Sequence, residues 1–160
     1  MRKLLLMVTA TVVGVAMLAF GAVSASAAAH FMSASDAVAD SGALVVSWDE
    51  AGLGNGNINY TVSADATAQY ACINGGAKNP SAANKRSFVG QVSGGGSFQS
   101  KNGRVQASLT AGPLSNDGFT CPSGQRLVLA SVSYSNVVLT DTTNGVSVTL
   151  PDVSRTFLAL

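Results

Sequence analysis

The clearest pattern in the chain is the alternation of apolar and polar residues from Ile58 to Ile73, INYTVSADATAQYACI. One face carries Ile58, Tyr60, Val62, Ala64, Ala66, Ala68, Tyr70 and Cys72. A period of two is the signature of a half-buried β-strand. We interpret the stretch as two consecutive strands, with Cys72 at a strand end packed against the core.

Shorter stretches of the same period flank it. We expect further strands at 30–38, 43–50, 88–92, 96–98, 104–110, 126–139, 146–150 and 153–158. Gly94 and Gly95 are expected to separate the strands at 88–92 and 96–98. The pairs Asn102-Gly103 and Asn144-Gly145 favour hairpin turns, because Asn and Gly accept positive φ angles. No stretch keeps a helical period for three turns.

Eight to ten short strands separated by turn signals indicate an antiparallel sandwich or a barrel, and we favour the sandwich. A true immunoglobulin domain places its tryptophan between its cysteines, whereas Trp48 precedes both Cys72 and Cys121. We therefore predict an all-β antiparallel β-sandwich that is immunoglobulin-like in architecture without being a true immunoglobulin domain. Its disulfide is expected to join the loop after Ile73 to the loop before Gly124.

The start of the chain indicates export. Arg2 and Lys3 precede an apolar run from Leu4 to Val23, and Ala25-Ser26-Ala27 supplies the small residues of a cleavage site. A membrane anchor is the alternative, but Gly14 and Gly21 and the Ala/Ser-rich exit favour cleavage. We predict a signal peptide at 1–27, a single domain at 28–160 and a secreted protein with no membrane contact after cleavage.

Removing residues 1–27 from the 160-residue chain leaves 133 residues, enough for one domain with a core. Without Arg2 and Lys3, seven basic residues face eight acidic ones. This near-neutral charge argues against nucleic acid as a partner. In an oxidising compartment, Cys72 and Cys121 most simply form one disulfide.

The sequence holds little catalytic machinery. It has one histidine, no HExxH, no GxSxG, no metal-type cysteine spacing and no pattern for a cofactor. A hydrolase using two carboxylates is the first alternative. Asp49 and Glu50 are expected on opposite strand faces, whereas Asp65, Asp117, Asp141 and Asp152 are expected at strand ends.

A metal site at the new N-terminus is the second alternative. Cleavage after Ala27 would leave Ala28-Ala29-His30, whose amine, amide and imidazole nitrogens suit square-planar Cu(II) or Ni(II). Cleavage after Ala29 would make His30 the first residue, as in copper-dependent polysaccharide monooxygenases. Those enzymes need a second histidine, which this chain lacks.

The loops around the two cysteines are the surface predicted for binding. Lys78, Lys85 and Arg86 make the first loop mildly basic, and Phe119 in the second has no obvious strand to bury it. The alternative is that Phe119 plugs the end of the sandwich and the three cations are solvated.

Several motifs together resemble a group of small exported proteins from actinobacteria. They are AAHF after the signal, GALVVSWDEAGLGN, YTVSADATAQYACINGG, NPSAANK, CPSGQ, LVLASVSYSNVVLTDTTNG and PDVSRTF. The resemblance implies secretion and a compact β-rich domain, and no activity, ligand or site residue follows from it. We expect a non-catalytic extracellular binding or surface-associated protein, whose partner is a cell-wall or other extracellular polymer or a protein.

Overall fold

The computed structural model describes residues 28–74 and 84–160. The predicted signal peptide and Lys78 lie outside these described residues. The strands are β1 (His30–Val38), β2 (Leu44–Ala51), β3 (Gly56–Ile73), β4 (Lys85–Ser100), β5 (Arg104–Ala111), β6 (Arg126–Asp141), β7 (Val146–Leu150) and β8 (Val153–Thr156). The described ranges contain no helix, and so none that is long and apolar enough to cross a membrane.

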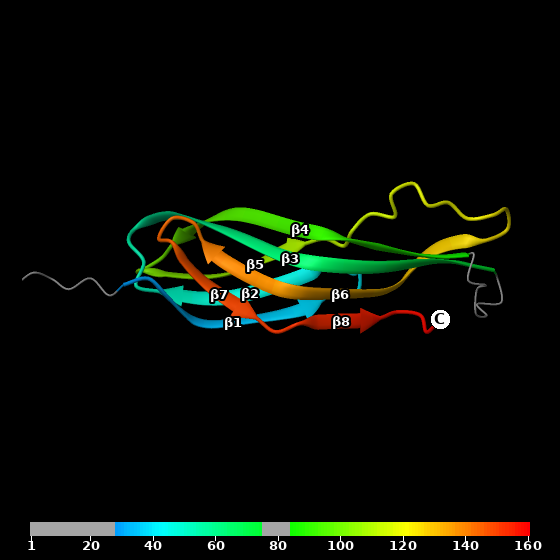
Figure 1. The fold of residues 1–160 in the computed structure, drawn as a ribbon. Coiled ribbons are helices and arrows are strands. Elements are labelled where there is room, and N and C mark those ends of the chain that lie inside the picture. The colour runs from blue at the N-terminus through cyan, green and yellow to red at the C-terminus, as the bar shows by residue number, and fades with distance from the viewer. Residues whose placement is uncertain (1–27, 75–83) are drawn as a thin grey trace, which may run out of the picture.

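Two antiparallel sheets pack together, which confirms the predicted β-sandwich. The smaller sheet has the order β1-β2-β5, and the larger has the order β4-β3-β6-β7 with β8 also paired to β6. In Figure 1 the smaller sheet covers only part of the larger one, because β3, β4 and β6 continue past it toward the end that carries the 112–125 loop.

The core fills the space between the two sheets. Trp48 of β2 and Tyr60 of β3 lie with their ring centroids 4.6 Å apart, and Phe98 of β4 meets the Trp48 ring edge-on at 5.3 Å. The first half of β3 alternates between buried and exposed residues as its sequence predicts.

β3 and β4 each form one continuous strand, of 18 and 16 residues, where two strands each were predicted. β3 stays continuous because register shifts against β6, at Ser63/Asp65 and Gln69/Tyr70, absorb the irregularities. In β4 the glycine pair does not form a turn, and Gly94 instead allows β5 to approach closely. A Cβ at Gly94 would lie 2.1 Å from the backbone oxygen of Thr110 on β5.

Both predicted turns form, but only the turn between β6 and β7 closes a paired hairpin. β4 and β5 enter different sheets and pair only at the bridge between Lys101 and Arg104. Asn102 and Gly103 have φ angles of 52° and 72°, as a two-residue turn between β4 and β5 requires. Between β6 and β7 only Gly145 has a positive φ, and the Asp141 carboxylate accepts hydrogen bonds from the backbone N–H groups of Thr143 and Asn144.

The disulfide lies where the long strands extend past the smaller sheet. Cys72 and Cys121 are bonded with their Cα atoms 5.4 Å apart. Cys72 is still within β3, which confirms its predicted place at a strand end, so the bridge ties that strand end to a loop rather than joining two loops. The Tyr70 hydroxyl donates a hydrogen bond to the Leu114 carbonyl at 2.7 Å, which fixes the same loop nearer its start.

Candidate functional site

The outward side of the β1-β2-β5 sheet is mostly polar, with Ala37, Val45 and Ala51 as its apolar members. Strand alternation and register place the following polar residues on it, and we call them the polar sheet face: Ser33, Ser35, Ser47, Asp49, Arg104, Gln106, Ser108 and Thr110. Most are small hydroxyl side chains, so the longer, exposed side chains of Arg104 and Gln106 project above them, whereas the Asp49 side chain is only 14% exposed.

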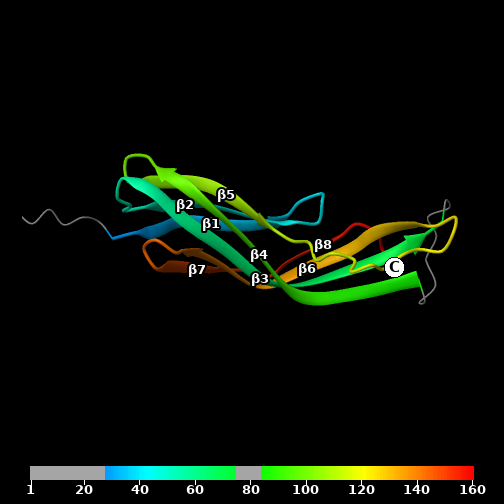
Figure 2. The same cartoon turned by 90° about the horizontal axis from the view of Figure 1, so that it is seen from above.

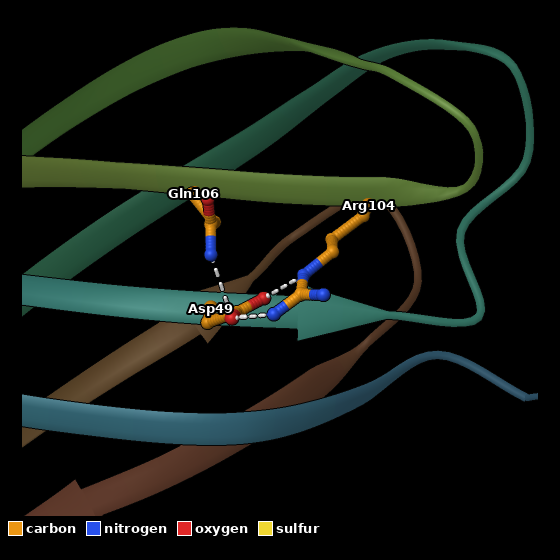
Figure 3. Close-up of polar contacts among 3 residues, drawn as sticks. All are labelled: Asp49, Arg104 and Gln106. Carbon is orange, nitrogen blue, oxygen red and sulfur yellow. Dashed lines mark hydrogen bonds and ion pairs between the residues drawn. The ribbon is translucent and has the colours of Figure 1, made fainter.

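Asp49, Arg104 and Gln106 form one hydrogen-bonded array on this face. Asp49 lies directly across from Gln106 in the ladder, and Arg104 is two residues before Gln106 on β5. Figure 3 shows both β5 side chains directed at the Asp49 carboxylate. The Arg104 guanidinium donates to both carboxylate oxygens, through Nε at 2.6 Å and through Nη2, and Gln106 Nε2 donates at 2.9 Å.

This array keeps Asp49 ionised. The hydrogen bond from Arg104, followed by the one from Gln106, lowers the pKa of Asp49 to about 2. The same contact raises the pKa of Arg104. A carboxylate and a guanidinium held in this way present fixed acceptors and donors to a ligand, and Asp49 is a poor general acid at neutral pH.

Two open depressions flank the array, and Gln106 borders both. The larger, about 540 Å³, is lined by Phe98, Gln99, Lys101, Arg104, Val105 and Gln106. The smaller, about 320 Å³, is lined by Ser33, Ser35, Ser47, Trp48, Asp49, Gln106 and Ala107. Together they extend from β1 across β5 to β4, so a chain-like ligand lying across the strands would meet the array near its middle.

A second pair of carboxylates is closed to substrates. Glu50 and Asp141 are fully buried, and the Glu50 oxygens have no hydrogen-bond partner among the described residues. Burial, and then the nearby Asp141 carboxylate, raise the pKa of Glu50, partly offset by the Tyr60 hydroxyl. Asp49 and Glu50 do lie on opposite faces, as predicted.

Asp65 departs from its prediction. It lies in the middle of β3 rather than at a strand end, and its carboxylate accepts hydrogen bonds from Gln91 at 3.2 Å and Asn136 at 2.7 Å. These contacts, that of Asn136 first, lower the pKa of Asp65. The outward side of the larger sheet thus carries a second carboxylate held by side-chain amides, as Asp49 is held by Gln106, but this array has no arginine.

Of the residues predicted for binding, the three that the structure describes, Lys85, Arg86 and Phe119, lie at the disulfide end. Lys85 and Arg86, which were predicted in the loop, instead begin β4 and pair with Ala71 and Tyr70 at the end of β3. The Asn84 side chain donates to Gln125 at 3.2 Å, which joins the start of β4 to the loop that carries Phe119. Phe119 is half-buried and lies outside the main core cluster.

His30 begins β1 and is exposed. Its Nδ1 lies 2.8 Å from the Ala28 carbonyl oxygen. In the predicted tripeptide metal site, Nδ1 would have to give up this contact in order to coordinate Cu(II) or Ni(II). In the part of the chain that the structure describes, no three His, Cys, Asp or Glu side chains gather closely enough to hold a metal.

The fold and this surface define a disulfide-linked β-sandwich with a polar, open sheet face. No protein-family model, no curated protein and no solved structure matches the chain. Sequence reasoning missed the polar sheet face as a site, although the alternation at 43–50 and 104–110 already assigned its side chains to exposed positions.

Proposed function

We propose that the chain is a secreted, non-catalytic binding protein that attaches to a hydroxyl-rich extracellular polymer, such as a cell-wall polysaccharide, through the polar sheet face. The observation that carries the proposal is the array of Asp49, Arg104 and Gln106 between two open depressions. Carboxylate, guanidinium and amide groups together offer both donors and acceptors to hydroxyl groups.

The position of the array on paired strands supports binding. Neighbouring strands fix the backbone of all three residues, and their mutual hydrogen bonds limit side-chain freedom. A ligand then orders little of the protein when it binds, which reduces the entropic cost.

The absence of turnover is part of the proposal. Glu50 and Asp141 are closed to solvent, and Arg104 holds Asp49 as a carboxylate. Neither arrangement offers the exposed, separately tuned acid and base that hydrolysis of a glycosidic bond uses. The N-terminal apolar run and the disulfide support secretion, since such bonds persist in oxidising compartments. Membership of the small exported actinobacterial group belongs to the same proposal.

Co-sedimentation tests this function. The purified mature protein is mixed with washed bacterial cell walls, chitin or cellulose at low and high salt, and the supernatant is assayed for released sugar. We expect retention on one polymer without sugar release, and modest sensitivity to salt because the array contains only one cation and one anion. Failure to bind any polymer, or release of sugar, would contradict the proposal.

The same assay separates the two candidate surfaces. Gln106→Ala changes the polar sheet face, whereas Arg86→Ala and Phe119→Ala change the disulfide end. We expect the first substitution to weaken retention and the other two to leave it unchanged. The reverse pattern would move the binding site to the surface predicted from sequence.

A further inference from the structure

Among the described residues, no strand pairs with the outer side of the first half of β4, from Lys85 to Ser93, and we call this segment the β4 edge. β4 pairs with β3 on one side, and β5 approaches its other side only from about Gly94 onward. No backbone hydrogen bond reaches this edge from the 112–125 loop among the described residues. Figure 2 shows this half of β4 as the outermost strand of the larger sheet.

The edge carries an exposed apolar residue at its midpoint. Val89 is 80% exposed, and among the described residues Met32 on β1, at 59%, is the other large hydrophobic of this kind. Unpaired backbone groups together with an exposed valine are features that favour pairing with a further strand.

We propose that two copies of the chain associate through this edge, pairing antiparallel about a two-fold axis at Val89. Each edge residue then faces a defined residue of the second copy. The pairs are Val89 with Val89, Phe88 with Gly90, Ser87 with Gln91, Arg86 with Val92 and Lys85 with Ser93.

In that register, the side chains on the edge of one copy are complementary to those on the edge of the second copy. Phe88 lies beside Gly90 of the second copy, where Leu114 of that copy comes within 3.4 Å of the position that a Cβ would take, so the ring meets an apolar surface. Tyr70 already packs edge-on against Phe88 at 5.8 Å, so pairing extends an existing apolar layer. Ser87 and Gln91 are able to hydrogen-bond across the new ladder.

The charges fit the same register. Lysine and arginine commonly protect free edges from pairing, but here Lys85 and Arg86 lie at one end only. Antiparallel pairing places them across from uncharged Ser93 and Val92, with the cations of the two copies at opposite ends.

Charge substitutions at the axis test the proposal by sedimentation velocity over a wide concentration range. We expect the wild-type protein to dimerise. Val89→Lys and Val89→Glu place like charges directly opposite each other and should each weaken self-association by about tenfold or more. An equal mixture of the two variants should dimerise again, because lysine then faces glutamate.

Met32→Lys is the matched control, since it places the same charge at an exposed apolar position on another strand, and it should dimerise like the wild type. A wild-type protein that stays monomeric would overturn the proposal. So would dimerisation of Val89→Lys at wild-type strength, failure of the mixture to associate, or loss of association in Met32→Lys. Circular dichroism of each variant verifies folding. None of these readouts depends on polymer binding.

Discussion

Asp49 and Glu50 are neighbours in the sequence with opposite electrostatic environments. Asp49 faces out and is held by Arg104 and Gln106, which lower its pKa to about 2. Glu50 faces in, and burial raises its pKa. A period of two along β2 is sufficient to separate them. The exposed pair of Asp49 with Arg104 contributes little to stability, as is usual for surface ion pairs.

Glu50→Gln should stabilise the protein at neutral pH by about 1–2 kcal/mol, because it removes a buried carboxyl next to Asp141 and keeps its shape. A folded-state pKa above the ordinary 4.5 means that the contribution of Glu50 is fully present below that pH and is lost as the pH rises through the folded-state pKa. Urea unfolding of both proteins between pH 4 and pH 8 measures the effect.

The difference in unfolding free energy between Glu50→Gln and the wild type should grow from about pH 4.5 upward. Comparing the two proteins cancels the opposite contribution of Asp49, whose lowered pKa makes stability fall as the solution becomes strongly acidic. A difference that is independent of pH would show that Glu50 titrates in the folded protein as it does in the unfolded chain.

At the level of the elements, short alternating segments indicated where strands lie but not how long they are. Gly94-Gly95 has the composition of a turn, yet β4 runs through it, because Thr110 of β5 needs the space that a side chain would fill. That contact joins residues far apart in the sequence. No local pattern distinguishes a glycine in a turn from one at a close approach.

Gly94→Ala should destabilise the fold by about 2 kcal/mol, because the new methyl group would clash with the Thr110 backbone, which cannot move without displacing β5. Gly95→Ala is the control, since its Cβ would lie 3.4 Å from the nearest atom, an ordinary contact. Thermal unfolding of the two variants gives the comparison. Equal stabilities would contradict the assignment of Gly94 to a close approach.

At the scale of the whole molecule, the class of fold and the disulfide followed from the sequence, whereas the site did not. Alternation, Asn-Gly turns and two cysteines in a chain with a predicted export signal were enough for a disulfide-linked sandwich. The array depends on β2 pairing with β5, which brings Asp49 beside Gln106. Strand order is a long-range property, so local patterns pointed instead to the loops with Lys85, Arg86 and Phe119.

The disulfide should dominate the stability of the molecule. Its two cysteines are separated by 49 residues, and closing a loop of this length stabilises a fold by roughly 4 kcal/mol through the lost entropy of the unfolded chain. Cys72→Ser with Cys121→Ser should lower the free energy of unfolding by up to that amount. A loss below about 1 kcal/mol in urea unfolding would show that the contacts of the 112–125 loop, such as Tyr70 with Leu114, hold the end without the bridge.

The central claim is that the polar sheet face binds the polymer. It is tested most directly by binding isotherms of two glutamine variants on the polymer that retains the wild-type protein. Gln106→Ala removes a donor from the Asp49 array, and Gln91→Ala removes the equivalent donor to Asp65 on the larger sheet. We predict about tenfold weaker binding for Gln106→Ala, the loss expected when a charge-assisted hydrogen bond is removed, and wild-type affinity for Gln91→Ala. Equal affinities of the two variants, or a loss confined to Gln91→Ala, would contradict the claim.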